Sequence, residues 1–123
     1  MLGDVAVAIN PKDKRHKGLL KKTVILPLVN RRLKVIEDNF VDPKFGTGIV
    51  KVTPAHDPND FDMANRHGLE PVVVMDSKAQ MINVGDYSGM DRFKAREAVL
   101  EDLKERGLIE KVLPHRHAVG HCY

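Results

Sequence analysis

An extended run that stops at a proline and is followed at once by a helix start constrains this chain most. Residues 46–53 read Gly-Thr-Gly-Ile-Val-Lys-Val-Thr, and their alternation predicts a strand with Ile49 and Lys51 on one face. Pro54 ends the strand in a tight turn. Asp57 then supplies an N-cap directly before Pro58, a residue favoured at the first helical position. A strand-to-helix junction is therefore predicted near the middle of the chain.

The remaining pattern mixes short strands with two helices. The first helix extends to His67 and ends at Gly68, and the second covers residues 90–106 and ends at Gly107. Phe93, Val99, Leu100 and Leu103 form the apolar face predicted for the second helix. Strands are expected over residues 4–10, 23–28, 33–36, 46–53 and 71–75, with one or two more in 108–123.

Three of these segments carry more specific expectations. Residues 23–28 and 33–36 should pair as a hairpin, residues 11–22 should form a loop with a short helical turn, and the valines of 71–75 indicate a strand buried on both faces. The six or seven strands do not alternate with helices as in βαβ units. The expected fold is one α+β domain over residues 1–123, with a mixed, barrel-like sheet and about two main helices.

Composition excludes several classes of protein. The longest apolar stretch, residues 23–29, contains a proline and is far too short to cross a bilayer. The single cysteine, Cys122, excludes an internal disulfide and suits a reducing cytosol. His115, His117, His121 and Cys122 have spacings that make a poor zinc site, so no metal is expected and the histidines are read as core or surface residues. These features predict a cytoplasmic location and no membrane partner.

Positive charge is concentrated at the beginning of the chain. Residues 1–35 contain nine lysines and arginines against two aspartates, a net +7 in a chain whose total is +3, so the remainder carries −4. Such a segment is able to contact a phosphate backbone, and it is equally compatible with a solvated lysine-rich loop. With no tryptophan and few other aromatic residues, a base-stacking platform for single strands is not expected.

Chemistry-bearing residues gather at the predicted junction. Helix capping alone explains Asp57 and Asp60, but it requires neither His56 nor Lys51. Together the four residues place a cation, an imidazole and two carboxylates around one turn, which suits a ligand with an ammonium group and a polar side chain. The glycines at 46 and 48 do not form a phosphate loop, because no Gly-Lys-Ser/Thr follows.

The sequence around the junction resembles a known family. Residues 46–61, which include Lys-Val-Thr-Pro-Ala-His-Asp-Pro-Asn-Asp, are similar to the second signature of the editing insertion of valyl-tRNA synthetases. The isoleucyl and leucyl enzymes have related insertions that differ within this window. Residues 1–8 resemble the end of the family's first signature, and residues 115–123 resemble the exit from the insertion. The resemblance therefore spans the whole chain.

The resemblance implies a hydrolytic site that needs no cofactor, since ATP and magnesium serve only the synthetic site of the parent enzyme. Asp60 is similar to the carboxylate that holds the α-ammonium of a misattached threonine. Asp57, Lys51 and Thr53 resemble residues that line the pocket, Phe45 resembles a stacking residue for the terminal nucleotide, and His56 is a further pocket residue without an assigned role as base. The implied partners are the 3′ acceptor end of tRNA carrying threonine and the rest of a monomeric synthetase.

One part of the family pattern is missing. The Thr-Thr-Arg-Pro-Glu-Thr of the first signature is expected to precede Met1, so the chain is interpreted as an N-terminally truncated editing domain. Three alternatives remain: an isoleucyl or leucyl editing domain, a non-catalytic module that binds the tRNA acceptor end, and a structural fragment that neither binds nor cleaves.

Overall fold

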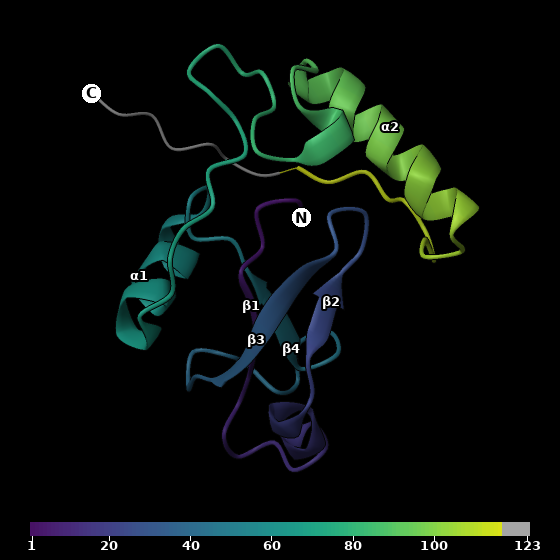
Figure 1. Ribbon diagram of the computed structural model, residues 1–123. Coiled ribbons are helices and arrows are strands. Elements are labelled where there is room, and N and C mark those ends of the chain that lie inside the picture. Colours follow the sequence, from purple (N-terminus) through teal and green to yellow (C-terminus); the bar gives the residue numbers. More distant parts are fainter. Residues whose placement is uncertain (117–123) are drawn as a thin grey trace.

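The computed structural model describes residues 1–116, which form a small curled sheet flanked by two helices (Figure 1). The strands are β1 (Ala6–Ile9), β2 (Val24–Leu26), β3 (Arg31–Glu37) and β4 (Ile49–Val52). The helices are α1 (Pro58–His67) and α2 (Arg92–Glu105), with short 3-10 turns η1 (Lys17–Lys21) and η2 (Gly85–Tyr87). Within the described residues, neither helix is long and apolar enough to span a membrane.

The sheet is mixed, in the order β2-β3-β1-β4. β1 lies in the middle, where it pairs in parallel with β3 and antiparallel with β4. Its central position makes β1 the most protected strand, with Ala6, Ala8 and Ile9 fully buried. The four strands curl into a half-barrel, so the expected α+β class with a barrel-like mixed sheet and two main helices is confirmed. The described part of the chain contains four strands, fewer than the six or seven expected.

The hairpin and the helical turn were predicted correctly. β2 and β3 pair antiparallel, with Val24 opposite Leu33, and the turn between them holds Leu28 and Asn30 at positive φ. η1 is the short turn expected within the basic loop of residues 11–22. Asparagine tolerates the left-handed conformation well, whereas a leucine there carries steric strain.

The first hydrophobic cluster lies between the sheet and α1. Met63 and Ala64 of α1 are buried against Ala6, Ala8 and Val52 of the sheet. Burial of one α1 face fixes the helix beside the strand that precedes it, β4. This packing determines the geometry of the junction between β4 and α1.

The second hydrophobic cluster includes no residue of the four strands and is formed around Val74, in the segment that follows α1. Leu2, Val74, Val84 and Tyr87 are buried there, and Ala95 is the buried residue that α2 contributes. The expected strand over residues 71–75 is not formed. In that segment the only ladder contact among the described residues is an isolated bridge from Met75 to Met81.

The physical reason is that residues 71–75 have no neighbouring strand. The backbone N–H of Val74 is bonded to the side chain of His56, and the carbonyl of Val73 accepts from the side chain of Asn83. Val73 is 48% exposed, so the prediction of burial on both faces was also wrong. Two of the backbone groups of this segment are thus satisfied by side chains, and the carbonyl of Val74 accepts from the backbone N–H of Ile82 at 3.0 Å.

The apolar face predicted for α2 is only partly buried. Val99 and Leu103 are half-buried, whereas Phe93 is 57% exposed and lies under the guanidinium of Arg92, 4.7 Å from its ring centroid. α2 lies at the edge of the molecule (Figure 1), and Leu100 of the same face is 36% exposed. Residues 108–116 form no strand, and the rest of the expected C-terminal strands falls outside the described residues.

Candidate functional site

The junction between β4 and α1 has the local structure that the sequence predicts. The N–H of His56 donates to the carbonyl of Thr53 at 3.1 Å, which closes the turn after β4. Oδ1 of Asp57 accepts from the N–H groups of Asn59 and Asp60 and caps α1. At the other end Gly68 adopts φ 59°, the left-handed conformation of a helix C-cap. Both ends of α1 are thus fixed by the residues predicted for them.

Asp60 is a buried carboxylate at the centre of the junction, with 5% of its surface exposed. Its Oδ2 atom accepts from the backbone N–H of Thr53 at 2.8 Å and from Nζ of Lys51 at 3.2 Å. Among the described residues its Oδ1 atom accepts no hydrogen bond. A buried carboxylate with one oxygen engaged and the other without a described hydrogen bond retains the capacity to accept from a further donor.

The two residues that hold this carboxylate differ in exposure, because Lys51 is largely exposed and Thr53 is buried. The side chain of Lys51 is 54% exposed, so its ammonium is able to move between Asp60 and solvent. Thr53 is buried, and its hydroxyl donates to Oδ1 of Asp4 at 2.5 Å. The Thr53 side chain is therefore held by the beginning of the chain, while its backbone holds Asp60.

Asp4 is the buried polar residue of this site that the sequence did not reveal. It is 4% exposed, and its second described partner is the amino group of Met1, 3.6 Å from Oδ1. Nη1 of Arg31 donates to the carbonyls of Leu2 and Asp4 and fixes the adjoining backbone. Because Asp4 and Thr53 are 49 positions apart, no local spacing indicates their contact.

His56 and Asp57 have defined structural partners. Nε2 of His56 accepts from the N–H of Val74 at 3.2 Å, which places the proton of the neutral ring on Nδ1. Partial burial lowers the pKa of His56, and the positive amino group of Met1 lowers it further. No described contact joins His56 to Asp60. The imidazole connects the junction to the segment that follows α1, and Asp57 serves as the cap of α1.

Phe45 lies apart from these contacts, on the loop of residues 42–48 between β3 and β4. It is 77% exposed, the largest exposed fraction of any described phenylalanine. The loop continues directly into β4, the strand that carries Lys51 and ends beside Thr53. The structure thus brings Lys51, Thr53 and Asp60 into contact and leaves Phe45 facing solvent upstream of them.

A hollow lined by described residues lies away from the junction. It measures about 530 Å³ and is bounded by the β2–β3 turn, η2 and the end of α2. Tyr87, whose hydroxyl donates to the carboxylate of Asp102, forms part of its wall. Burial, together with that carboxylate, raises the pKa of Tyr87 to about 12. Lys51, Thr53, Asp57 and Asp60 do not line this hollow.

Within residues 1–116, no group of three His, Cys, Asp or Glu side chains is arranged to hold a metal ion. Three of the residues considered for a zinc site, His117, His121 and Cys122, lie outside the described residues. The acidic groups of the junction are instead paired with a lysine, a threonine and backbone N–H groups.

Comparison with known proteins identifies the family. A family model described as leucyl-tRNA synthetase, editing domain, matches residues 6–104, which include the whole junction. The chain belongs to this editing-domain family. The match covers the sheet, α1 and nearly all of α2, so the fold described above is the fold of an editing domain.

Relatives of the editing domain are valine–tRNA ligases. The chain is 58% identical to the enzyme of Pseudothermotoga lettingae and 53% identical to that of Thermotoga maritima over its full length. It is 52% identical to the Bacillus subtilis enzyme over 98% of its length. The chain spans about 14% of the length of each of these relatives. The resemblance to the valyl enzymes that residues 46–61 indicated is confirmed.

Proposed function

We propose that this editing domain hydrolyses the ester that joins threonine to the tRNA for valine, as part of a valine–tRNA ligase. The observation that carries the proposal is Asp60, which is buried at the junction with Oδ2 held by Thr53 and Lys51 and with no described hydrogen bond to Oδ1. In this proposal the second oxygen accepts a hydrogen bond from the α-ammonium of a misattached amino acid. Family membership and the valine–tRNA ligase relatives support the same assignment.

The need for such a site follows from the shapes of the two amino acids. Threonine and valine are nearly isosteric, so an apolar synthetic site discriminates between them only weakly. Valyl-tRNA synthetase is itself the standard example, with a ratio of about a hundredfold. A second site that forms a hydrogen bond with the threonine hydroxyl binds threonine in preference to valine. When valine enters such a site, a buried polar group is left unpaired, which costs about 1–3 kcal/mol.

The residues of the junction have distinct roles in this proposal. Asp60 anchors the ammonium, while Lys51, Thr53 and Asp57 border the threonine and the terminal adenosine, and Phe45 stacks on the base. Water adds to the ester carbonyl, and the tetrahedral intermediate expels the ribose oxygen, which leaves as a hydroxyl. His56 has its Nε2 occupied by Val74, so it is not assigned as the base. The neighbouring ribose hydroxyl of the substrate orients the water.

The wider setting belongs to the same proposal. The partners are the 3′ end of tRNA and the remainder of a monomeric cytoplasmic synthetase. Threonyl-adenylate, which carries the same threonyl group on a phosphate in place of a ribose hydroxyl, is a second substrate. No cofactor takes part in ester hydrolysis, since ATP and magnesium act only in the synthetic site.

The first prediction concerns Asp60 in the full-length ligase. Asp60→Ala should slow release of threonine from threonyl-tRNA by roughly 10- to 100-fold, the range expected for a lost hydrogen bond to a charged group. Charging with valine should be unchanged, because the synthetic site is elsewhere. Deacylation of purified threonyl-tRNA and valine charging are measured side by side.

Asp62→Ala is the matched control, because Asp62 lies on the same helix, is exposed and makes no described hydrogen bond. Circular dichroism establishes that both variants remain folded. Normal deacylation by Asp60→Ala would contradict the role of the carboxylate. Binding of tRNA by the unmodified ligase without any release of threonine would favour a non-catalytic tRNA-binding module. A preference for isoleucyl- or valyl-tRNA over threonyl-tRNA would instead favour the isoleucyl or leucyl type of editing domain.

A further inference from the structure

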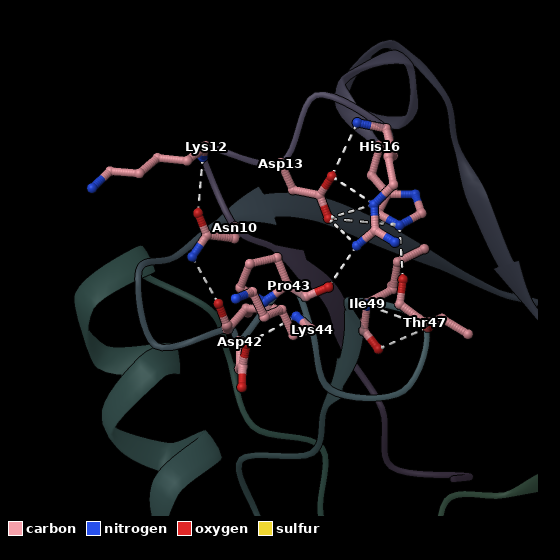
Figure 2. A network of polar contacts seen from close by, with 11 residues as sticks. Asn10, Lys12, Asp13, His16, Asp42, Pro43, Lys44, Thr47 and Ile49 are labelled. Carbon is pink, nitrogen blue, oxygen red and sulfur yellow. Dashed lines mark hydrogen bonds and ion pairs between the residues drawn. The ribbon is translucent and has the colours of Figure 1, made fainter.

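Two segments far apart in the sequence are joined beside the exposed aromatic residue of the candidate site. The first, residues 10–16, follows β1, and the second is the Phe45 loop, defined as residues 42–48. Figure 2 shows the side chains of Asp13 and His16 facing this loop. At the edge of the network, Nδ2 of Asn10 donates to the carbonyl of Val41 at 2.7 Å, immediately before the loop begins. The Phe45 loop is thus held from outside as well as by its own turns.

An ion pair between a buried carboxylate and a guanidinium that is 59% exposed forms the base of the connection. Asp13 is 7% exposed, and its carboxylate accepts from Nε and Nη2 of Arg15, at 2.9 Å and 2.6 Å. The backbone N–H of Arg15 also donates to Oδ1 of Asp13 at 3.0 Å. Two-pronged contact of this kind fixes the plane of a guanidinium group. Arg15 is therefore presented to the loop in one orientation.

The contacts to the loop are placed symmetrically around Phe45. Nη2 of Arg15 donates to the carbonyl of Pro43 at 2.5 Å, two residues before Phe45. Nε2 of His16 donates to the carbonyl of Thr47 at 2.8 Å, two residues after it. The backbone is thus held on both sides of the aromatic residue, while the ring itself remains in solvent.

Gly48 shows how closely the two segments approach. Its φ is 77°, and a Cβ atom there would lie 2.8 Å from Nη2 of Arg15 and 3.0 Å from the carbonyl oxygen of Pro43. A side chain at this position would force the guanidinium of Arg15 to move away and would crowd the carbonyl of Pro43 and the carboxylate of Asp13. Glycine supplies both the left-handed conformation and the space.

We propose that Asp13, Arg15 and His16, here called the loop clamp, position Phe45 to receive the terminal base of the tRNA in the editing reaction. This inference rests on the proposed function. An exposed ring on a fixed backbone loses little conformational entropy when a base stacks on it, so the clamp increases affinity without contacting the ester. Its three members are positioning residues that act through Phe45.

The second prediction is a change in KM alone. Arg15→Ala in the full-length ligase should raise the KM for threonyl-tRNA deacylation roughly tenfold, within the range that loss of one base–aromatic stack produces. The kcat should stay within about twofold, because no reacting atom touches the clamp. His16→Ala should act in the same direction, and His16→Gln should restore most of the affinity, since its amide is able to donate to the carbonyl of Thr47.

A double-mutant cycle with Phe45→Ala separates positioning from electrostatic attraction. Once the ring is absent, Arg15→Ala should cause little further increase in KM, so the two effects are not additive. Lys14→Ala removes the same charge from the same segment without a described contact to the loop, and its effect should add to that of Phe45→Ala. Additive behaviour of Arg15→Ala, or an equal fall in kcat, would overturn the inference.

The same set of variants distinguishes failure of the clamp from failure of the proposed function. If the unmodified ligase releases threonine and Asp60→Ala does not, the proposed editing function is supported. The double-mutant cycle of Arg15→Ala and Phe45→Ala then tests the loop clamp independently. If the unmodified ligase releases none, the cycle is repeated by calorimetry with a non-hydrolysable amide analogue of threonyl-adenosine. Coupling between Arg15 and Phe45 in that binding supports the clamp, and additivity or absence of binding overturns it. Should Arg15→Ala fail to fold, His16→Ala takes its place in the cycle.

Discussion

Buried carboxylates with dedicated partners determine much of the local geometry of this domain. Asp38, at the end of β3, accepts from Nη2 of Arg66 at 2.8 Å, from Nε2 of His67 at 2.9 Å and from the N–H of Phe40. Burial by itself raises the pKa of Asp38, but these hydrogen bonds outweigh it and the pKa is lowered. Asp13 follows the same principle, because its hydrogen bond with Arg15 lowers the pKa to about 2.

The third prediction is that protonation of Asp38 at acidic pH reduces the free energy of unfolding. A carboxylate with a lowered pKa in the folded state stabilises the fold above its unfolded pKa, about 4, and this stabilisation disappears as the pH falls through the folded value. Asp38→Asn should therefore lower the free energy of unfolding at pH 7. The difference from the unmodified chain should shrink below about pH 4. Urea denaturation across this pH range measures it.

Asp62→Asn provides the comparison, since its exposed carboxylate makes no described hydrogen bond and should leave the pH profile unchanged. A deficit for Asp38→Asn that is equally large at pH 7 and pH 2 would show that loss of the ion pair is not the cause.

At the scale of elements, capping residues were predictable and pairing partners were not. Asp57 and Gly68 lie where their chemistry requires them, because a helix end is determined by a few consecutive residues. Residues 71–75 have the composition of a buried strand, but a strand also needs a neighbour, and local sequence does not specify one. Val74 instead gives its N–H to His56, 18 positions earlier.

The fourth prediction separates the capping role of Asp57 from a role in the site. Asp57→Ala should reduce the free energy of unfolding by about 1 kcal/mol, the usual cost of a lost N-cap. Asp57→Ser keeps a capping oxygen and should retain most of the stability. Chemical denaturation gives the stabilities, and threonyl-tRNA deacylation by the full-length ligase gives the activities. If Asp57→Ser is stable yet as inactive as Asp57→Ala, the carboxylate contributes more than a cap.

Across the whole molecule, two separate hydrophobic clusters replace a single core. One joins α1 to the sheet and includes Met63, and the other surrounds Tyr87 and reaches α2 only through Ala95 and its half-buried neighbours. The buried apolar residues are thus divided between two clusters. Of the two helices, α2 is the less buried. Phe93 illustrates the result, because periodicity predicted it to be in the core and the structure exposes it.

The fifth prediction contrasts these environments. Met63→Ala should reduce the free energy of unfolding by about 2–5 kcal/mol, because a fully buried side chain leaves a cavity between α1 and the sheet. Phe93→Ala should change it by no more than about 0.5 kcal/mol, as expected for an exposed position. Thermal or urea unfolding of the two variants provides the test. A comparable loss in both would mean that the α2 face is covered in solution.

The candidate site was predictable to the extent that its residues are neighbours in sequence. Lys51, Thr53 and Asp60 lie within ten positions, and one strand followed by one helix brings them together. Asp4 was not predictable, because its contact with Thr53 arises only when β1 pairs with β4. The contact between Arg15 and Pro43 is likewise a product of sheet order, which no local motif encodes.

The central position of β1 also has a consequence for biosynthesis. This strand leaves the ribosome first of the four, yet its two neighbours are β3 and β4, which end at Glu37 and Val52. The ladder with β3 must therefore wait until the chain up to Glu37 has emerged, and the ladder with β4 until the chain up to Val52 has emerged, and contacts of such wide separation form slowly. During translation β1 therefore emerges before either of the strands that it pairs with, and the sheet is completed only when β3 and β4 add to its two sides.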